Sequence, residues 1–69
     1  MRLSARNQLT GTVASVEDGA VMTIVKVDLG GGQTVTASVT KESVADLGLS
    51  VGSPVTAIIK STEVMLGVE

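Results

Sequence analysis

Two positively charged residues with hydroxyl side chains beside them are the residues of this sequence best suited to bind a ligand. Arg6 lies in the segment SARN at the start of the chain, beside Ser4, and Lys60 precedes Ser61 far along the sequence. Arginine presents a planar fork of donors, lysine a compact charge, and serine a rotatable hydroxyl. If folding brings the two segments together, they form a set of hydrogen-bond donors around two positive charges.

A third group of donors is expected where a short helix begins. The segment TKESVADLGL, residues 40–49, changes from strand-like to helical spacing, with Thr40 as the N-cap and Gly48 as the residue that ends the helix. Free backbone N–H groups at a helix start favour anions, and Thr40 and Ser43 flank this start. Together the donors describe a site for a small, multiply charged oxyanion. Residue types alone leave open that Arg6 and Lys60 are solvated surface charges and that Thr40 is only a helix cap.

The sequence offers no arrangement for catalysis. It has no histidine, no cysteine and no serine beside a plausible base, so the usual nucleophiles are missing and a thiolate or imidazole metal site is excluded. The carboxylates are scattered over predicted turns, the predicted helix and the chain end, which does not pair them for acid–base work. They are Glu17, Asp18, Asp28, Glu42, Asp46, Glu63 and Glu69. We therefore expect a binding protein and not an enzyme.

Length and composition predict one domain, residues 1–69, that assembles with other copies. Ordering 69 residues costs on the order of 100 kcal/mol, and a chain this short buries a limited share of its surface. Aromatic residues are absent, although hydrophobic residues make up 43% of the chain. Because disulfides are excluded too, we expect apolar surface that only another subunit covers.

Charge and hydropathy exclude several partners. The formal net charge is −2, whereas a nucleic-acid-binding protein normally has a basic face, and no aromatic side chain is present to stack on bases. No apolar run approaches the length of about 20 residues that spans a membrane, and no signal peptide is visible. We expect a cytoplasmic protein that binds neither nucleic acid nor membranes.

Alternating β-branched residues predict a mainly β fold. In residues 20–29, Thr23, Val25 and Val27 fall on one face, and Met22 and Ile24 on the other, where they are a candidate subunit contact. Expected strands cover residues 10–18, 20–29, 33–39, 55–60 and 64–66, with the helix before the fourth. This order predicts an all-β fold, a small OB-like Greek-key barrel of about five strands with one short helix.

The three glycines at residues 30–32 have two interpretations. A phosphate-cradling loop would need a helix directly after it, but the segment QTVTASV alternates like a strand. The sequence therefore predicts a hairpin turn at this position.

Three segments resemble the molbindins, small molybdate-binding Mop proteins. They are SARNQLTGTV at the start, VTKESVADLGL in the middle and VTAIIKSTEVMLG near the end, so the resemblance spans essentially the whole chain. It implies an OB-like barrel that assembles as a hexamer, a trimer of dimers. It also implies that molybdate or tungstate is held at subunit interfaces by hydrogen bonds, with no protein ligand to the metal.

The resemblance also assigns residues to the anion site. Ser4, Ala5 through its backbone, and Arg6 would come from one subunit, together with Lys60 and Ser61. By the same resemblance Thr40 and Ser43 would come from a neighbouring subunit. The adjoining Asn7 and Gln8 belong to the motif, but their part in binding is not assigned beyond fixing the arm.

The chemistry of the donors agrees with that assignment. Molybdate is a tetrahedral dianion whose oxygens only accept hydrogen bonds, and charge-assisted hydrogen bonds contribute roughly 1.5–3 kcal/mol each. The hypothesis is a protein that stores or buffers molybdate. The alternatives are an OB-type structural or interaction module without a small ligand, and a component of molybdate transport or sensing.

Overall fold

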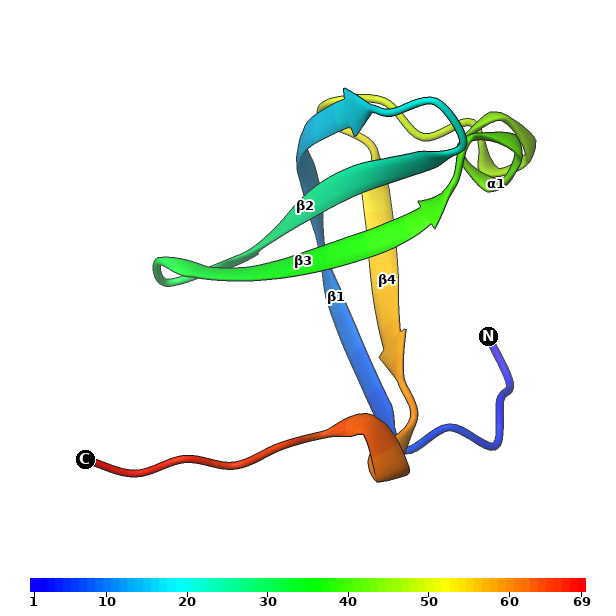
Figure 1. The fold of residues 1–69 in the computed structure, drawn as a ribbon. Helices are drawn as coiled ribbons and strands as arrows, with labels where there is room; N and C mark the ends of the chain where they lie inside the picture. The colour runs from blue at the N-terminus through cyan, green and yellow to red at the C-terminus, as the bar shows by residue number, and fades with distance from the viewer.

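Four antiparallel strands form one sheet in the computed structural model, which describes all 69 residues (Figure 1). The elements in chain order are β1 (Asn7–Asp18), β2 (Met22–Gly30), β3 (Gln33–Thr40), α1 (Lys41–Leu47), β4 (Pro54–Ile59) and the 3₁₀ turn η1 (Ser61–Glu63). The spatial order is β3-β2-β1-β4, so β4 returns beside the first strand of a meander. This is the Greek-key connection, and the predicted fold class is confirmed.

The tip of the β2–β3 hairpin is the two-residue turn at Gly31 and Gly32. Their φ angles are 61° and 80°, as a type I′ turn requires, and Gly30 pairs with Gln33 across its base. Asp28 supports the turn, because its Oδ1 accepts a hydrogen bond of 2.8 Å from the Gly30 N–H. The predicted hairpin turn is confirmed.

Strand β1 serves two ladders and bends between them. Residues 7–12 pair with β4, and residues 12–18 pair with β2, with a register shift between Val13 and Ser15 that leaves Ala14 as the extra residue. Such a β-bulge bends a strand and reverses its alternation. Val13 and Val16 can therefore both face the core although they are three positions apart. Gly11 lies at this bend, where a Cβ atom would be 2.5 Å from the carbonyl oxygen of Asp28.

The core of a single chain is small. Only four of its 69 residues are buried, namely Val13, Thr23, Val25 and Val27. Thr23 satisfies its hydroxyl by donating a hydrogen bond of 3.0 Å to Oδ1 of Asp18. Partly buried valines and leucines from every strand and from α1 surround this centre, as the alternation predicts.

Helix α1 lies at one end of the sheet and is anchored at its start. The Lys41 N–H donates to the carbonyl oxygen of Val21 at 3.0 Å, and Thr40 is the N-cap, as predicted. Gly48 ends the helix in a left-handed conformation, as predicted. Val44 packs against the core, whereas Leu47, three residues later, is 70% exposed.

The prediction of a strand at residues 64–66 is wrong for the single chain. After η1 the chain runs in an extended path away from the sheet, without strand pairing (Figure 1). Its apolar side chains are among the most exposed of the molecule: Val64 45%, Met65 92%, Leu66 96% and Val68 100%. An alternating segment becomes a strand only beside a partner, and within one chain none lies next to this tail.

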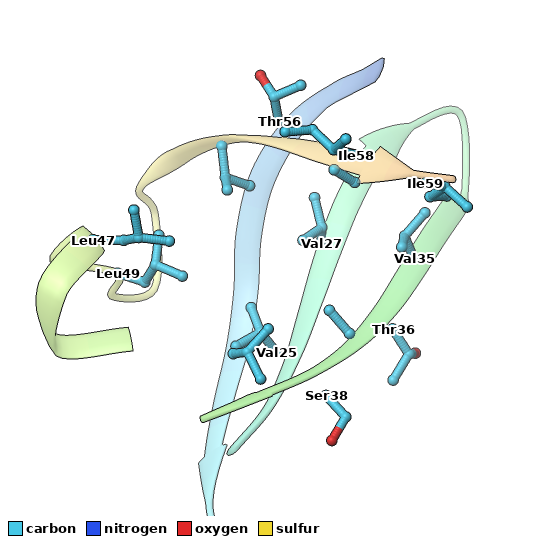
Figure 2. A pocket seen from close by; sticks show the side chains of 14 residues that line it. Val25, Val27, Val35, Thr36, Ser38, Leu47, Leu49, Thr56, Ile58 and Ile59 are labelled. Atoms are coloured by element: carbon cyan, nitrogen blue, oxygen red, sulfur yellow. The ribbon is translucent and has the colours of Figure 1, made fainter. Parts of the chain in front are cut away.

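With four strands the sheet curls into a half-barrel and leaves its concave side open. A hollow of about 510 Å³ lies between the two edge strands β3 and β4, and 11 of the 14 residues that line it are hydrophobic. Figure 2 shows Val27, Val35 and Ile59 from three strands around it, with Leu47 and Leu49 at one end. A single chain therefore leaves uncovered the apolar surface that a closed barrel would bury.

Candidate anion-binding site

The β1–β4 ladder brings the two predicted cation segments together. Asn7 and Ile59 are the last pair of the ladder, so Arg6 and Lys60 are the next residues on the two chain segments. Figure 1 shows the N-terminal arm and η1 at this same end of the molecule. Arg6 and Lys60 thus adjoin the last pair of the ladder, and the other predicted residues of these two segments follow them along the chain: Ser4, Ala5 and Ser61.

The side chains at this end are free to meet a ligand. Ser4, Arg6, Lys60 and Ser61 are exposed, and Ala5 is half-buried. Neither Arg6 nor Lys60 takes part in the side-chain hydrogen bonds of the molecule. Two like charges near each other repel, and a bound anion converts that repulsion into attraction.

The turn η1 places Ser61 directly after Lys60. Lys60 is extended and occupies the N-cap position, and its carbonyl oxygen accepts a hydrogen bond of 2.9 Å from the Glu63 N–H. β4 ends at Ile59, one residue earlier than expected, so Lys60 belongs to this turn and not to the strand. The chain turns here and leaves the direction of β4, so the lysine and the serine lie at the end of the ladder.

Asn7 and Gln8 hold the two segments in place, a role for which residue type gave no signal. Asn7 Nδ2 donates to the carbonyl oxygen of Ile59 at 3.1 Å, and Gln8 Nε2 donates to the carbonyl oxygen of Ala5 at 2.8 Å. Both residues lie in β1, which begins three residues earlier than predicted. The strand starts early because β4 lies opposite, although asparagine and glutamine have little intrinsic preference for strands.

Thr40 and Ser43 form a separate hydroxyl pair at the start of α1. The Ser43 N–H donates to Thr40 Oγ1 at 3.0 Å, and the Thr40 hydroxyl donates to Ser43 Oγ at 2.8 Å. This chain of bonds leaves the Ser43 hydroxyl hydrogen free to donate. The expectation of free backbone N–H groups is wrong for Lys41 and Ser43, because both amides are already bonded.

A single chain does not bring this hydroxyl pair to the cations. Figure 1 shows α1 at one end of the sheet and the N-terminal arm with η1 at the other. Thr40 pairs with Met22 at the far end of the β2–β3 ladder, whereas Arg6 and Lys60 adjoin the Asn7–Ile59 pair. The predicted donor set is thus divided into two groups on one molecule.

Other kinds of site find little support in the chain. No group of three or more histidine, cysteine, aspartate or glutamate residues is placed to hold a metal ion. Neither helix is long or apolar enough to cross a membrane. The apolar hollow in Figure 2 does not suit an oxyanion, since its lining offers few donors for a dehydrated charge.

Comparison of sequences identifies relatives over the whole chain. Residues 3–66 match the sequence profile of the TOBE domain. A probable molybdenum-pterin-binding protein of Haemophilus influenzae is 51% identical over 69 residues, the full length of both chains. Molybdenum-pterin-binding protein 3 of Clostridium pasteurianum is 46% identical over 66 residues, covering 96% of this chain and 97% of its own.

Solved structures share the fold. MopII from Clostridium pasteurianum superposes with a TM-score of 0.91 at 39% identity, over 97% of this chain and 100% of that one. The cytoplasmic molybdate-binding protein ModG, solved with molybdate bound, superposes with a TM-score of 0.94 at 54% identity. This chain is covered completely in that match but spans 49% of the ModG chain. The names of these relatives describe binding proteins, for molybdenum-pterin or for molybdate. With a TOBE profile over nearly all its residues and full-length relatives at this identity, the chain belongs to the TOBE domain family and, within it, to the Mop proteins or molbindins.

Proposed function

We propose that this protein binds molybdate, and tungstate equally well, and that it stores or buffers the anion in the cytoplasm. The observation that carries the proposal is the pair of cations, Arg6 and Lys60, at the end of the β1–β4 ladder with serine hydroxyls beside them. The relatives support it, because ModG is described as a cytoplasmic molybdate-binding protein and was solved with molybdate bound. A protein of known structure from Sporomusa ovata, 41% identical over 96% of this chain, is likewise described as a molybdate-binding protein.

The chemistry of the donors matches the anion. Molybdate carries two negative charges, which Arg6 and Lys60 neutralise, and its oxygens accept hydrogen bonds from Ser4, Ser61 and the backbone at Ala5. Each charge-assisted hydrogen bond contributes roughly 1.5–3 kcal/mol, so several of them outweigh dehydration enough for micromolar affinity, about −8 kcal/mol. No protein atom needs to coordinate the molybdenum, and the absence of histidine and cysteine is no obstacle to such a site.

Thr40 and Ser43 complete the site from a neighbouring subunit in this proposal. Their hydroxyl pair lies at the opposite end of the same chain, so only another copy can bring it to Arg6 and Lys60. The Ser43 hydroxyl hydrogen is then the donor that reaches the anion. A site closed between two subunits excludes water, which strengthens each charged hydrogen bond.

A hexamer, a trimer of dimers, is the assembly we infer. One chain buries four residues and leaves an apolar hollow of about 510 Å³ between its edge strands. It also carries an extended apolar tail, Val64 to Val68, that makes no strand in its own sheet. The tail of one copy can cover the hollow of another, because it supplies apolar side chains for the hollow and a strand that can pair with an open sheet edge.

Calorimetric titration of the purified protein with sodium molybdate tests the binding proposal. We expect saturable binding with a Kd near or below the micromolar range, and no heat of binding with sodium chloride at the same ionic strength. Absence of binding would leave an OB-type interaction module as the better description. Sedimentation equilibrium on the same samples tests the assembly, for which we expect about six chains per particle.

A further inference from the structure

Two consecutive amide side chains each tie down a different half of the cation site. Asn7 is half-buried and bonds across the ladder to Ile59, whereas Gln8 is exposed and bonds back along the chain to Ala5. Neighbouring residues of a strand point to opposite faces, so the two bonds lie on opposite sides of β1. We propose that Asn7 and Gln8 are positioning residues for the anion site, an inference that rests on the proposed function.

Gln8 orients the peptide group between Ala5 and Arg6. Its Nε2 holds the Ala5 carbonyl oxygen at 2.8 Å, and in a trans peptide the N–H of the next residue points the opposite way. The Arg6 N–H is therefore turned away from Gln8, and it is used in none of the backbone hydrogen bonds outside the helices and strands. An acceptor facing an oxyanion repels it, so Gln8 withholds the Ala5 carbonyl oxygen from the site and leaves the Arg6 N–H available as a donor in addition to the backbone N–H of Ala5.

Asn7 fixes the other half of the site. The last backbone pair of the ladder is Asn7 with Ile59, and strand ends fray where pairing stops. The hydrogen bond of 3.1 Å from Asn7 Nδ2 to the Ile59 carbonyl oxygen reinforces that last pair immediately before Lys60. It thereby sets the point from which Lys60 and Ser61 leave the strand.

Both bonds are needed because the site residues lie outside the regular elements. Ser4, Ala5 and Arg6 precede β1, and Lys60 follows β4, so no ladder hydrogen bond positions them. Without the amides, more of each segment would have to be ordered when the anion binds, and this ordering costs conformational entropy. The amides order part of both segments in advance, which raises affinity without touching the ligand.

Titration of variants with sodium molybdate tests this role. Gln8→Met keeps the length of the side chain and removes the donor, and Asn7→Leu does the same at the other position. We expect each variant to bind about twofold to tenfold more weakly, which corresponds to the net contribution of one hydrogen bond. Gln33→Met is the matched control, because Gln33 is an exposed glutamine at the start of β3, beside the hairpin turn and away from the arm. Asn7→Ala is a second variant that adds no bulk at the half-buried position.

A purely structural role is distinguished by the Arg6 amide signal in ¹⁵N–¹H correlation spectra. Molybdate should shift this signal in the wild type and in Gln33→Met, and should shift it much less in Gln8→Met at saturation, while the thermal midpoint of the ligand-free protein stays unchanged. Wild-type affinity in Gln8→Met and in both Asn7 variants would overturn the inference, as would weakened binding that only follows unfolding or dissociation. A wild-type protein that does not bind molybdate would refute the proposed function itself, and the inference with it.

Discussion

Replacing Arg6 or Lys60 by glutamine tests the charge pair at the end of the β1–β4 ladder directly. Either substitution removes one positive charge and keeps a polar side chain that can donate a hydrogen bond. Both residues are exposed, and neither makes a side-chain hydrogen bond in the chain. We therefore expect both variants to fold normally and to lose most of their affinity for molybdate.

The size of the loss depends on how far the neighbouring subunit covers the site. Two unit charges 4 Å apart interact by about 1 kcal/mol in water and by about 4 kcal/mol at the effective dielectric near a protein surface. Removing one partner of a buried charge pair typically costs about 3–5 kcal/mol, which corresponds to roughly a hundredfold to a few thousandfold in Kd. A site left open to solvent would lose only about fivefold, the equivalent of about 1 kcal/mol. The measured ratio therefore reports both the role of the cation and its burial in the assembly.

Calorimetry at fixed ionic strength is the assay, with Lys26→Gln as the matched control. Lys26 is an exposed lysine in the middle of β2, paired with Thr36 and Ser15, so its replacement changes the net charge equally without touching the arm or η1. Sedimentation of each variant shows that the assembly is intact. If Arg6→Gln or Lys60→Gln binds molybdate as tightly as Lys26→Gln does, that residue is a surface charge and its assignment to the site is wrong.

Three further outcomes are expected. Ending the chain after Glu63 should yield smaller particles in sedimentation and a lower Tm, because burial of each large apolar side chain of the tail contributes about 1.5–3 kcal/mol. A truncated protein that stays hexameric would exclude the tail as a subunit contact. Gly11→Ala should lower the free energy of unfolding by about 1–3 kcal/mol in urea titrations. The alanine Cβ would lie 2.5 Å from the Asp28 carbonyl oxygen and 2.8 Å from Val27 Cγ1. Unchanged stability would mean that β1 can move away from β2. In competition titrations tungstate should bind with the same affinity as molybdate, and sulfate much more weakly because it is smaller. Phosphate binding should be negligible, because the proton on partly protonated phosphate meets only donors. Phosphate that displaces molybdate at similar concentration would contradict a donor-only site.

Local features of the fold were predictable because their causes are local. The alternation through Thr23, Val25 and Val27 predicts the buried face of β2, and these three residues are buried. Gly31 and Gly32 permit the hairpin turn, and the Thr40 side chain caps the helix by accepting a hydrogen bond from the amide of Ser43, three residues ahead. Each of these depends on a few neighbouring residues, so the sequence carries the signal directly.

Features that depend on distant partners were missed or misplaced. β1 begins at Asn7 because Ile59 lies opposite, and no property of the segment SARNQ alone indicates a strand. The tail after Glu63 has strand-like composition but no partner in its own chain, so the fifth strand does not form there. The amide of Lys41 is bonded because Val21, twenty positions earlier in the sequence, presents its carbonyl oxygen at the helix start.

The candidate site likewise has parts that the sequence could predict and parts that it could not. That Arg6 and Lys60 should be neighbours follows from the resemblance to molbindins, and the ladder between β1 and β4 supplies the physical reason. The parts of Asn7 and Gln8 could not be read from residue type, because an amide side chain is equally suited to bind a ligand, to bond to backbone or to face water. Only the positions of the Ile59 and Ala5 carbonyl oxygens distinguish these uses.

The open barrel and the divided donor set have a common consequence. One chain lacks apolar cover for its hollow, and it also lacks hydroxyl donors beside its cations, since Thr40 and Ser43 lie at the other end. If another copy supplies both, the contacts that complete the fold also complete the site. Binding and assembly are then linked, because an anion that binds only the assembled protein stabilises it by RT ln(1 + [L]/Kd), about 2.7 kcal/mol at a hundredfold excess over Kd. An assembly held by its own apolar surfaces would also keep the site formed when the anion leaves, as the proposed reversible storage of molybdate requires.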